Sequence, residues 1–186
     1  MSALVDRILS GQFTLIAEIG VNYYDIATER GITPMEAAKL MCLEAKDAGI
    51  HAVKFQTYKA ENLAAKESPS YWDTTEEPTT SQRELFKKFD SFGESEYEEL
   101  AKYCEDIGID FCSTAFDFES ADYLDRLMDV YKISSSDLTN IPFIEYQAAK
   151  GKPIIMSVGA GDLDEMKNAV QAVRKVSNAP LVLMHC

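Results

Sequence analysis

The sequence has few histidines, no paired cysteine motif and no long apolar run. Its two histidines, His51 and His185, are too few for a self-contained histidine-rich metal site. The four cysteines form no C-x-x-C pair and each lies within or beside an apolar segment, so we expect buried free thiols. No apolar run approaches the ~20 residues that a membrane span needs, and the start of the chain lacks the apolar stretch of a signal peptide. We therefore expect a cytoplasmic protein without a membrane partner.

A basic surface is missing as well. The chain has 18 Lys and Arg against 31 Asp and Glu, a formal net charge of −13, which argues against nucleic acid as a partner. An acidic surface repels anions at long range. Any site for an anionic ligand must therefore be local, built from a few converging lysines and backbone amides.

What the chain does contain is a regular alternation of short β-rich runs and longer helical stretches. Strict alternation implies right-handed crossovers and a parallel sheet, either open or closed into a barrel. The first βα turn has no G-x-G-x-x-G, which weakens a dinucleotide-binding fold. A full βα-barrel has eight units in about 250 residues, and we count about six. Strands are predicted at 14–19, 51–57, 110–113, 130–133, 153–157 and 180–185, and helices at 34–48 (N-capped by Thr33), 95–107, 120–128, 141–150 and 163–176.

Residues 59–92 interrupt this rhythm. The segment is rich in Glu, Thr, Ser and Pro and holds the single tryptophan, Trp72. One helix is predicted inside it, at 82–89. Connections of this length in compact domains are usually functional lids or mobile segments. Aromatic and apolar side chains such as Tyr71, Trp72 and Phe86 argue against full disorder.

Polar side chains gather where the predicted strands end. In parallel α/β proteins this is the edge at which ligands bind. Polar groups on every strand end, around one rim, are a stronger signal than any single motif. These residues are Glu18, then Lys54, Gln56 and Thr57, then Ser113 and Thr114, then Lys132 with 134–137, then Ser157 and finally His185.

Two lysines are predicted to point inward. Side chains alternate along a strand, so Lys54 and Gln56 face the barrel axis with Ala52, while Val53 and Phe55 face the helices. The same alternation turns Lys132 inward with Val130. A lysine on a buried strand needs an anionic partner or a bound anion. The pair therefore favours a phosphate or carboxylate pocket, although a salt bridge from Lys54 to Glu18 is the structural alternative.

Other candidates remain open between structure and function. Glu18 is either the partner of Lys54 or a group for hydroxyl binding and proton transfer, and both can hold. Asn22 lies in a loop, where asparagine is common for turn reasons. Asp137 either orients water or begins the next helix. The serines around Ser135 either donate to phosphate oxygens or form a turn and helix cap. His185 is expected to be a hydrogen-bonded scaffold residue.

Six motifs in unbroken order resemble those of sialic acid synthases. Each is weak alone, but the series is specific and runs from about residue 13 to the end of the chain. The motifs are IAEIGVN (16–22), AVKFQTY (52–58), STAFD (113–117), YKISSSDLTN (131–140), GKPIIMSVG (151–159) and LMHC (183–186).

The resemblance implies an α/β fold, a parallel (βα)8 TIM-type barrel of which residues 1–186 are an incomplete part, ending after about the sixth strand. It implies the condensation of phosphoenolpyruvate with N-acetylmannosamine or a related amino sugar, with release of phosphate, for nonulosonate or surface polysaccharide biosynthesis. It also implies a divalent metal, Mn or Mg, whose ligands are expected beyond residue 186. A C-terminal antifreeze-like domain and a homodimer are expected of the full-length protein.

Residue roles carry over motif by motif. Lys54, Lys132, Thr114 and Ser135 are expected to hold phosphoenolpyruvate. Glu18 and Gln56 are expected at the sugar and the reacting centre, and Asp137, where the family usually has glutamate, at the water or the developing charge. Asn22, Thr57 and Ser157 are further candidates for substrate binding.

Several positions depart from the family pattern. The histidine that usually follows the first motif is Tyr23, the fifth-strand threonine is Val158, and a proline is Ala115. Two other readings therefore stand beside the synthase. One is a βα-barrel aldolase that uses Lys132 or Lys54 to form a Schiff base. The other is a non-catalytic barrel fragment that acts as a binding or assembly module.

Overall fold

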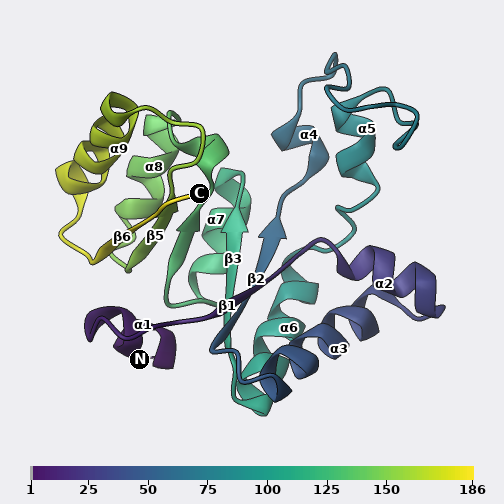
Figure 1. Cartoon of the computed structure of the whole chain (residues 1–186), viewed down its shortest axis with the longest axis horizontal. Coiled ribbons are helices and arrows are strands. Elements are labelled where there is room, and N and C mark those ends of the chain that lie inside the picture. Colours follow the sequence, from purple (N-terminus) through teal and green to yellow (C-terminus); the bar gives the residue numbers. More distant parts are fainter. Residues whose placement is uncertain (1) are drawn as a thin grey trace.

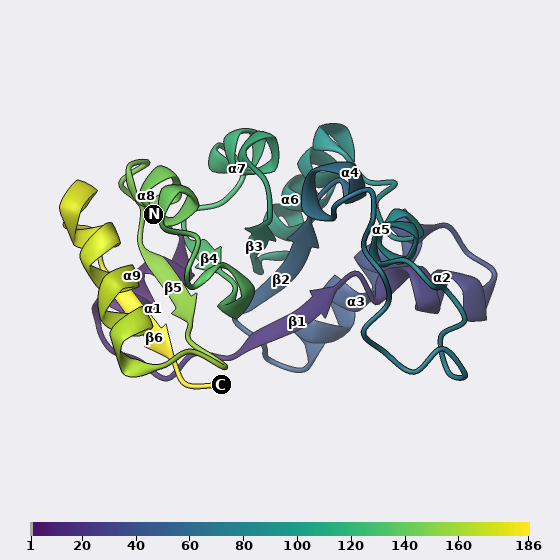
Figure 2. The same ribbon diagram turned by 90° about the horizontal axis from the view of Figure 1, so that it is seen from above.

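In the computed structural model, residues 2–186 are described and six parallel strands form an arc. They make two three-stranded sheets, β1–β2–β3 and β4–β5–β6, each in chain order. β3 and β4 lie side by side, so the two sheets follow one another around the arc, and its open side lies between β1 and β6 (Figures 1 and 2). The predicted strands are confirmed, with bounds of Ile16–Gly20 for β1, Ala52–Thr57 for β2, Asp110–Ala115 for β3, Tyr131–Ile133 for β4, Ile154–Ser157 for β5 and Leu181–Met184 for β6.

Helices cover the outside of the arc and connect its strands. The predicted helices are confirmed to within a few residues, as α3 (Pro34–Asp47), α6 (Glu94–Ile107), α7 (Phe118–Asp125), α8 (Ile141–Ala148) and α9 (Leu163–Val176). Their ends follow the local chemistry. Thr33 closes a reciprocal capping box with Glu36 at the start of α3, and Gly108 ends α6 in the left-handed conformation at φ 72°. Among residues 2–186, no helix is long and apolar enough to cross a membrane.

Four short elements were not predicted from the sequence. They are α1 (Ala3–Leu9), α2 (Tyr23–Arg30), α4 (Ala60–Leu63) and a 3₁₀ turn, η1 (Ser135–Asp137). The first of them has a clear role. α1 buries Leu4 and Val5 against Ala52, Val130 and Ile155 on the inner faces of the strands. This helix therefore forms an apolar floor at the amino-terminal ends of the strands (Figure 1).

The alternation of side chains along the strands is as predicted. Val53 and Phe55 belong to the main core beneath the helices, as do Tyr131 and Ile133. Their neighbours along the chain face the inside of the arc. The helix side is thus mostly apolar, and burial of each large side chain there contributes roughly 1.5–3 kcal/mol. Most of the polar groups of the strands lie on the inner face.

Residues 59–92, here called the arm, form an ordered excursion from the carboxyl end of β2. The arm holds α4 and α5 (Gln82–Lys87), the latter matching the predicted helix. The Trp72 indole donates to the Glu77 and Thr79 carbonyls, each at 3.1 Å. Lys59 Nζ donates to the Asp90 carbonyl at 2.7 Å and to the Phe92 carbonyl at 2.8 Å, which ties the two ends of the arm together. The arm stands above the strand ends in Figure 1.

The prediction of buried free cysteines holds for three of the four. Cys42, Cys104 and Cys112 are buried and free, and the sulfur atoms of the first two lie 3.7 Å apart. Cys186 is free but exposed, and His185 beside it is exposed as well, so neither is the buried or scaffold residue that was expected. Both follow β6, which is an edge strand of the arc and has no covering neighbour on one side among the described residues.

Candidate active site

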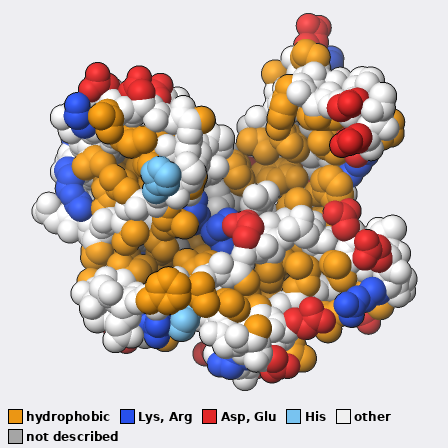
Figure 3. Space-filling model, viewed as in Figure 1, with side chains coloured by type: hydrophobic (Ala, Val, Ile, Leu, Met, Phe, Trp, Pro, Cys, Tyr) orange, Lys and Arg blue, Asp and Glu red, His pale blue; other side chains and the backbone are white. Residues whose placement is uncertain are grey.

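The inward polar side chains line one cavity of about 330 Å³ at the carboxyl ends of the strands. All six strands contribute to it, and Ile16, Phe116 and Met184 complete its wall. Figure 3 shows basic and acidic side chains next to one another in the middle of this face, within a mostly hydrophobic or uncharged surface. Seven predicted site residues lie here, namely Glu18, Lys54, Gln56, Thr114, Lys132, Ser135 and Ser157, together with Ser134.

Lys54 enters this cavity with a counter-charge. It is only 9% exposed, and its ammonium group forms an ion pair with the Glu18 carboxylate. The two residues are directly paired across β1 and β2, so their side chains leave the sheet on the same side. Lys54 Nζ also donates to Thr114 Oγ1 at 3.4 Å. The salt bridge from Lys54 to Glu18, which was the alternative to an anion pocket, is therefore observed. It lies inside the predicted pocket, so the two predictions are compatible.

Lys132 enters the same cavity without a carboxylate partner among the described residues. It is 8% exposed, and its Nζ donates to the Ile133 carbonyl at 2.8 Å. Burial, and then repulsion from Lys54, lower the pKa of Lys132 to about 8. A bound anion would relieve both effects because it would restore a counter-charge at this nitrogen. Lys132 is thus the cation in the cavity that most needs an anionic ligand.

The hydroxyl groups of the cavity are held by backbone contacts. Ser135 Oγ accepts a hydrogen bond from the Gly159 amide at 3.0 Å. A side chain at position 159 would bring its Cβ to 3.1 Å from that oxygen, so glycine permits this close approach. Ser157 is buried in the wall beside them. Together they place small hydroxyl groups on the same side of the cavity as Lys132.

A β-bulge positions the groups on the opposite side. The pairing of β1 with β2 shifts between Glu18 and Gly20, and Gly20 has φ +57°. A Cβ there would lie 3.3 Å from Glu18 Oε1 and 3.6 Å from the Gln56 amide carbon. The sequence must therefore have glycine here both for the left-handed backbone and for the space that these two side chains occupy.

Three predicted site residues lie outside the cavity. Thr57 is fully buried on the helix side of β2, where its Oγ1 lies 2.6 Å from Ser113 Oγ. Asn22 is exposed in the turn between β1 and α2, as expected of a loop residue, and its side chain makes no capping bond. Asp137 lies in η1, where Asn140 Nδ2 donates to its Oδ1 at 3.3 Å.

Asp137 nevertheless keeps an unusual environment. Its Oδ2 is buried and has no hydrogen-bond partner among the described residues, and burial raises the pKa of the carboxyl group. Ser136 lines a neighbouring pocket, so Asp137 stands close behind the rim without lining either cavity. Tyr23, at the position of the family histidine, is fully buried against Phe55 and Phe92 and also faces away from the cavity.

Some of the lining was missed from the sequence. Phe116 follows β3 and lines both the cavity and the neighbouring pocket, although an aromatic residue in that position carried no polar signal. Gly20 and Gly159 were identified from the sequence only as members of the family motifs, and no structural role was predicted for them. A positive φ or a close approach cannot be inferred from a single glycine without its neighbours in space.

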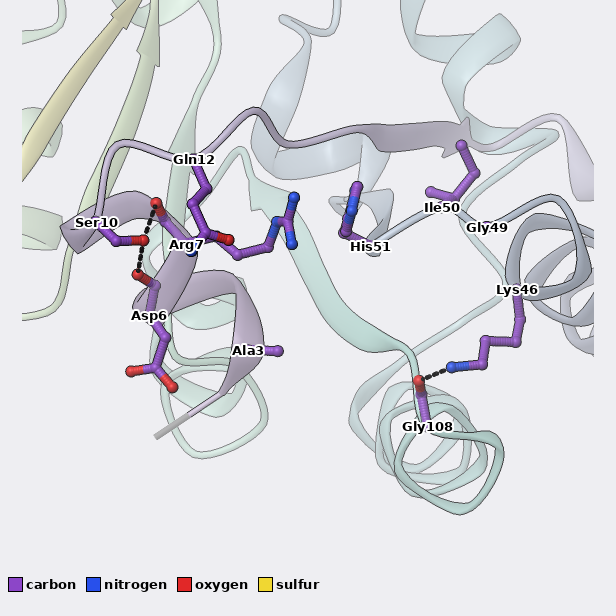
Figure 4. Close-up of a pocket in the computed structure, with 10 residues that line it drawn as sticks. All are labelled: Ala3, Asp6, Arg7, Ser10, Gln12, Lys46, Gly49, Ile50, His51 and Gly108. Atoms are coloured by element: carbon purple, nitrogen blue, oxygen red, sulfur yellow. Dashed lines mark hydrogen bonds between the residues drawn. The ribbon is translucent and has the colours of Figure 1, made fainter.

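A second hollow, of about 610 Å³, opens at the amino-terminal ends of the strands. Arg7, Lys46 and His51 line it (Figure 4). Its cations already have partners, since Arg7 binds the Phe13 carbonyl and Lys46 binds the Gly108 carbonyl. The His51 ring accepts the Leu15 amide through Nδ1 at 3.0 Å. These side chains hold loops together, so this hollow does not compete with the lysine cavity.

The described residues do not supply a ligand set for the implied divalent metal. Within residues 2–186, no three His, Cys, Asp or Glu side chains converge so that they could hold a metal ion. The Glu18 carboxylate, which lies in the cavity, is engaged by Lys54. Ligands from residues beyond Cys186 stay a prediction.

The arrangement defines a class of protein. Parallel strands joined by outer helices, with inward lysines and hydroxyl groups at the carboxyl-terminal rim, form part of a βα-barrel with an anion pocket at the end where barrel enzymes hold their substrates. A family model extends this to a particular family. It matches residues 41–186, and the chain therefore belongs to the NeuB family.

Relatives and solved structures agree with this assignment. The chain is 35% identical to the N,N'-diacetyllegionaminic acid synthase of Legionella pneumophila, over 92% of this chain and 48% of that protein. It is 30% identical to the N-acetylneuraminate-9-phosphate synthase of Drosophila melanogaster, over 98% of this chain and 48% of that protein. The crystal structure of the sialic acid synthetase of Leptospira borgpetersenii superposes with a TM-score of 0.75 at 29% identity, covering 93% of this chain and 53% of that chain. The chain thus spans about half the length of the proteins that it matches.

Proposed function

We propose that this chain forms the phosphoenolpyruvate-binding part of a synthase that makes a nonulosonic acid. Carbon 3 of phosphoenolpyruvate attacks the aldehyde carbon of an open-chain N-acyl amino sugar, and a new C–C bond forms. Water adds at carbon 2, the bond from carbon 2 to the phosphate oxygen breaks, and inorganic phosphate leaves. One phosphoenolpyruvate, one sugar and one water thus give one 2-keto acid and one phosphate.

One observation carries this proposal. Two lysines from different strands, each at least nine-tenths buried, line one cavity together with hydroxyl groups. Burial of two like charges is unfavourable unless anionic groups compensate them, and Glu18 compensates only one. Phosphoenolpyruvate brings a carboxylate and a phosphate, so it supplies the missing negative charge.

The residues divide into two groups by position. Lys132, Ser135 and Ser157 lie together and are suited to the phosphate oxygens. Lys54 with Thr114 is suited to the carboxylate, and Glu18 and Gln56 are suited to the hydroxyl groups and proton transfers of the sugar. Asp137, Asn22 and Thr57 would reach substrate only after a rearrangement, which makes them weaker candidates.

The remainder of the barrel is part of the proposal. Two further βα units would complete the eight of a closed barrel across the open side between β1 and β6. We expect residues beyond Cys186 to hold the Mn or Mg ion, and we expect the full-length protein to be a cytoplasmic homodimer. The metal would polarise the aldehyde when bound.

The test is phosphate release by the protein encoded by the full open reading frame. We expect release from phosphoenolpyruvate only when both a divalent metal and an N-acyl amino sugar are present. Release without sugar, or none with any amino sugar, would refute the proposal.

A Schiff-base aldolase is the second candidate, because the lowered pKa of Lys132 gives a larger share of neutral amine, the form that attacks carbonyl groups. Borohydride reduction in the presence of a carbonyl substrate separates the two. Covalent mass at Lys132 would favour the aldolase, whereas the synthase stays unmodified. A non-catalytic module would bind phosphoenolpyruvate without turning it over in the full-length protein.

A further inference from the structure

A second pocket adjoins the lysine cavity at its outer rim. It has a volume of about 520 Å³ and lies between the strand ends and the arm. The two hollows share Gln56 and Phe116, so they adjoin at these two side chains. Figure 3 shows hydrophobic surface on the side of the arm that faces the strands. A ligand that extends out of the lysine cavity past Gln56 and Phe116 would therefore reach this pocket.

Aromatic rings form the walls of this pocket and are held in place by one another. Tyr58, at the end of β2, meets Phe86 of α5 at 5.7 Å between ring centroids and Phe116 at 6.1 Å, both edge-on. Phe89 packs on Tyr24 at 5.6 Å. The backbone contacts of Lys59 fix both ends of the arm, so the pocket exists before a ligand binds.

The pocket has no charge of its own. Of the described residues that line it, none is Lys, Arg, His, Asp or Glu. Lys66 and Lys87 of the arm do not line the pocket, and the other three cations of the arm have partners elsewhere. Lys59 binds two backbone carbonyls, Lys88 donates to Glu77 at 2.8 Å, and Arg83 lies 3.9 Å from Glu61. A phosphate group in this pocket would lose hydration without gaining a counter-charge.

We propose that this pocket, here called the aromatic pocket, receives the end of the acceptor sugar opposite its aldehyde and selects for an uncharged, weakly polar end. The proposal rests on the proposed function, because the aldehyde must reach phosphoenolpyruvate beside Gln56. A sugar held in that orientation extends past Phe116 onto the rings. The C–H faces and methyl groups of acylamino and deoxy positions pack well on aromatic rings, whereas a phosphate does not.

The test compares three acceptors in the full-length protein with phosphoenolpyruvate and metal present. They are N-acetylmannosamine, its 6-deoxy analogue and its 6-phosphate, so that only the far end of the sugar changes. We expect kcat/KM to be highest for the 6-deoxy sugar and at least about tenfold lower for the 6-phosphate than for N-acetylmannosamine. Preference for the 6-phosphate would overturn the inference and leave the proposed function intact. No phosphate release with any of the three would refute the proposed function itself.

Two variants make the test specific to the pocket. Phe86→Ala should raise the KM for N-acetylmannosamine by about tenfold while the KM for phosphoenolpyruvate stays unchanged. Leu85→Arg should narrow or reverse the discrimination against the 6-phosphate, since it places a cation in the wall. Phe13→Ala removes an aromatic ring that is 78% exposed at the other end of the strands and should change neither value. If Phe86→Ala and Leu85→Arg both fold by circular dichroism and leave the ranking of acceptors unchanged, the inference is wrong.

Discussion

The two sides of the lysine cavity are neutralised in different ways. On the β1–β2 side, Lys54 has the Glu18 carboxylate as an ion-pair partner. On the β4–β5 side, Lys132 has only the Ile133 carbonyl, and its pKa falls to about 8. The β1–β2 side is thus complete without a ligand, whereas the β4–β5 side is stabilised by one. In the proposed function this difference favours the β4–β5 side for the phosphate group, because nearby hydroxyl groups can donate to it.

Removal of Lys132 should have the largest effect. We expect Lys132→Met to weaken phosphoenolpyruvate binding by roughly tenfold to over a hundredfold, because a hydrogen bond to a charged group contributes about 1.5–3 kcal/mol. Isothermal titration calorimetry on the full-length protein gives the affinity. Thermal stability without ligand should stay level or rise, since a buried charge without a carboxylate partner is removed. Lys39→Met, which breaks an exposed ion pair with Glu99, is the matched control and should leave binding unchanged. If Lys132→Met and the parent protein bind phosphoenolpyruvate with equal affinity, the proposed difference between the two sides of the cavity is wrong.

The pH dependence should report the same lysine. Only the protonated form of Lys132 attracts the anion, so affinity for phosphoenolpyruvate should fall as pH rises through about 8 and be about tenfold lower near pH 9 than near pH 7. The stability of the ligand-free protein should move the other way. The pKa of Lys132 in the folded protein lies below the value of about 10.4 for an unfolded chain. Between these two pH values the unfolded chain therefore holds more protons, and the free energy of unfolding rises with pH. Calorimetry at several pH values measures the first effect and chemical denaturation the second. A Lys132→Met variant that keeps the same pH profile would assign the effect elsewhere.

Glu18→Gln should sharpen the comparison in the opposite sense. Without the carboxylate, Lys54 becomes a second cation that lacks a counter-charge, and we expect phosphoenolpyruvate to bind about threefold to tenfold more tightly. Turnover should fall nonetheless, because the group suited to the sugar hydroxyls and proton transfers is lost. Binding and steady-state kinetics separate the two results. Weaker binding of phosphoenolpyruvate by Glu18→Gln would show that the ion pair orients Lys54 for the ligand instead of competing with it.

The bulge that places Glu18 is tested through stability instead of ligand binding. Gly20→Ala should cost roughly 1–2 kcal/mol of unfolding free energy for the left-handed backbone, with a further loss because the new methyl group crowds Glu18 and Gln56. Gly11→Ala is a close match, because Gly11 has φ +64° and open space around it. The difference between the two variants in urea denaturation isolates the crowding. Equal losses would mean that Glu18 and Gln56 move aside freely.

Alternation along the strands predicted the fold and most of the site. It turned Lys54, Gln56 and Lys132 inward and sent Val53 and Phe55 to the helices, as observed. The same alternation turns Thr57 to the helix side with Phe55. The prediction that Thr57 binds substrate came from its position at a strand end and did not take this alternation into account. The alternation of side chains along a strand is therefore a better guide to which residues face the cavity than closeness to the end of the strand.

Residues beyond the strand ends could not be placed in this way. Asn22 follows the bulge at Gly20, and Asp137 lies in a 3₁₀ turn, so no period relates either side chain to the cavity. α1 was missed because its stability comes from Leu4 and Val5 packing on strands far away in sequence. The aromatic pocket was missed for the same reason, since Phe86 and Phe116 meet Tyr58 only in space.

The indole of the arm has a practical consequence. Trp72 is the single tryptophan of the chain, and its ring meets Tyr71 edge-on at 5.2 Å, while Tyr71 itself lines the aromatic pocket. Ultraviolet excitation near 295 nm therefore excites one side chain of this chain, Trp72, which is next in sequence to Tyr71 of the proposed acceptor pocket. Titration of candidate sugars against emission intensity offers an optical assay of acceptor binding that needs neither turnover nor a label.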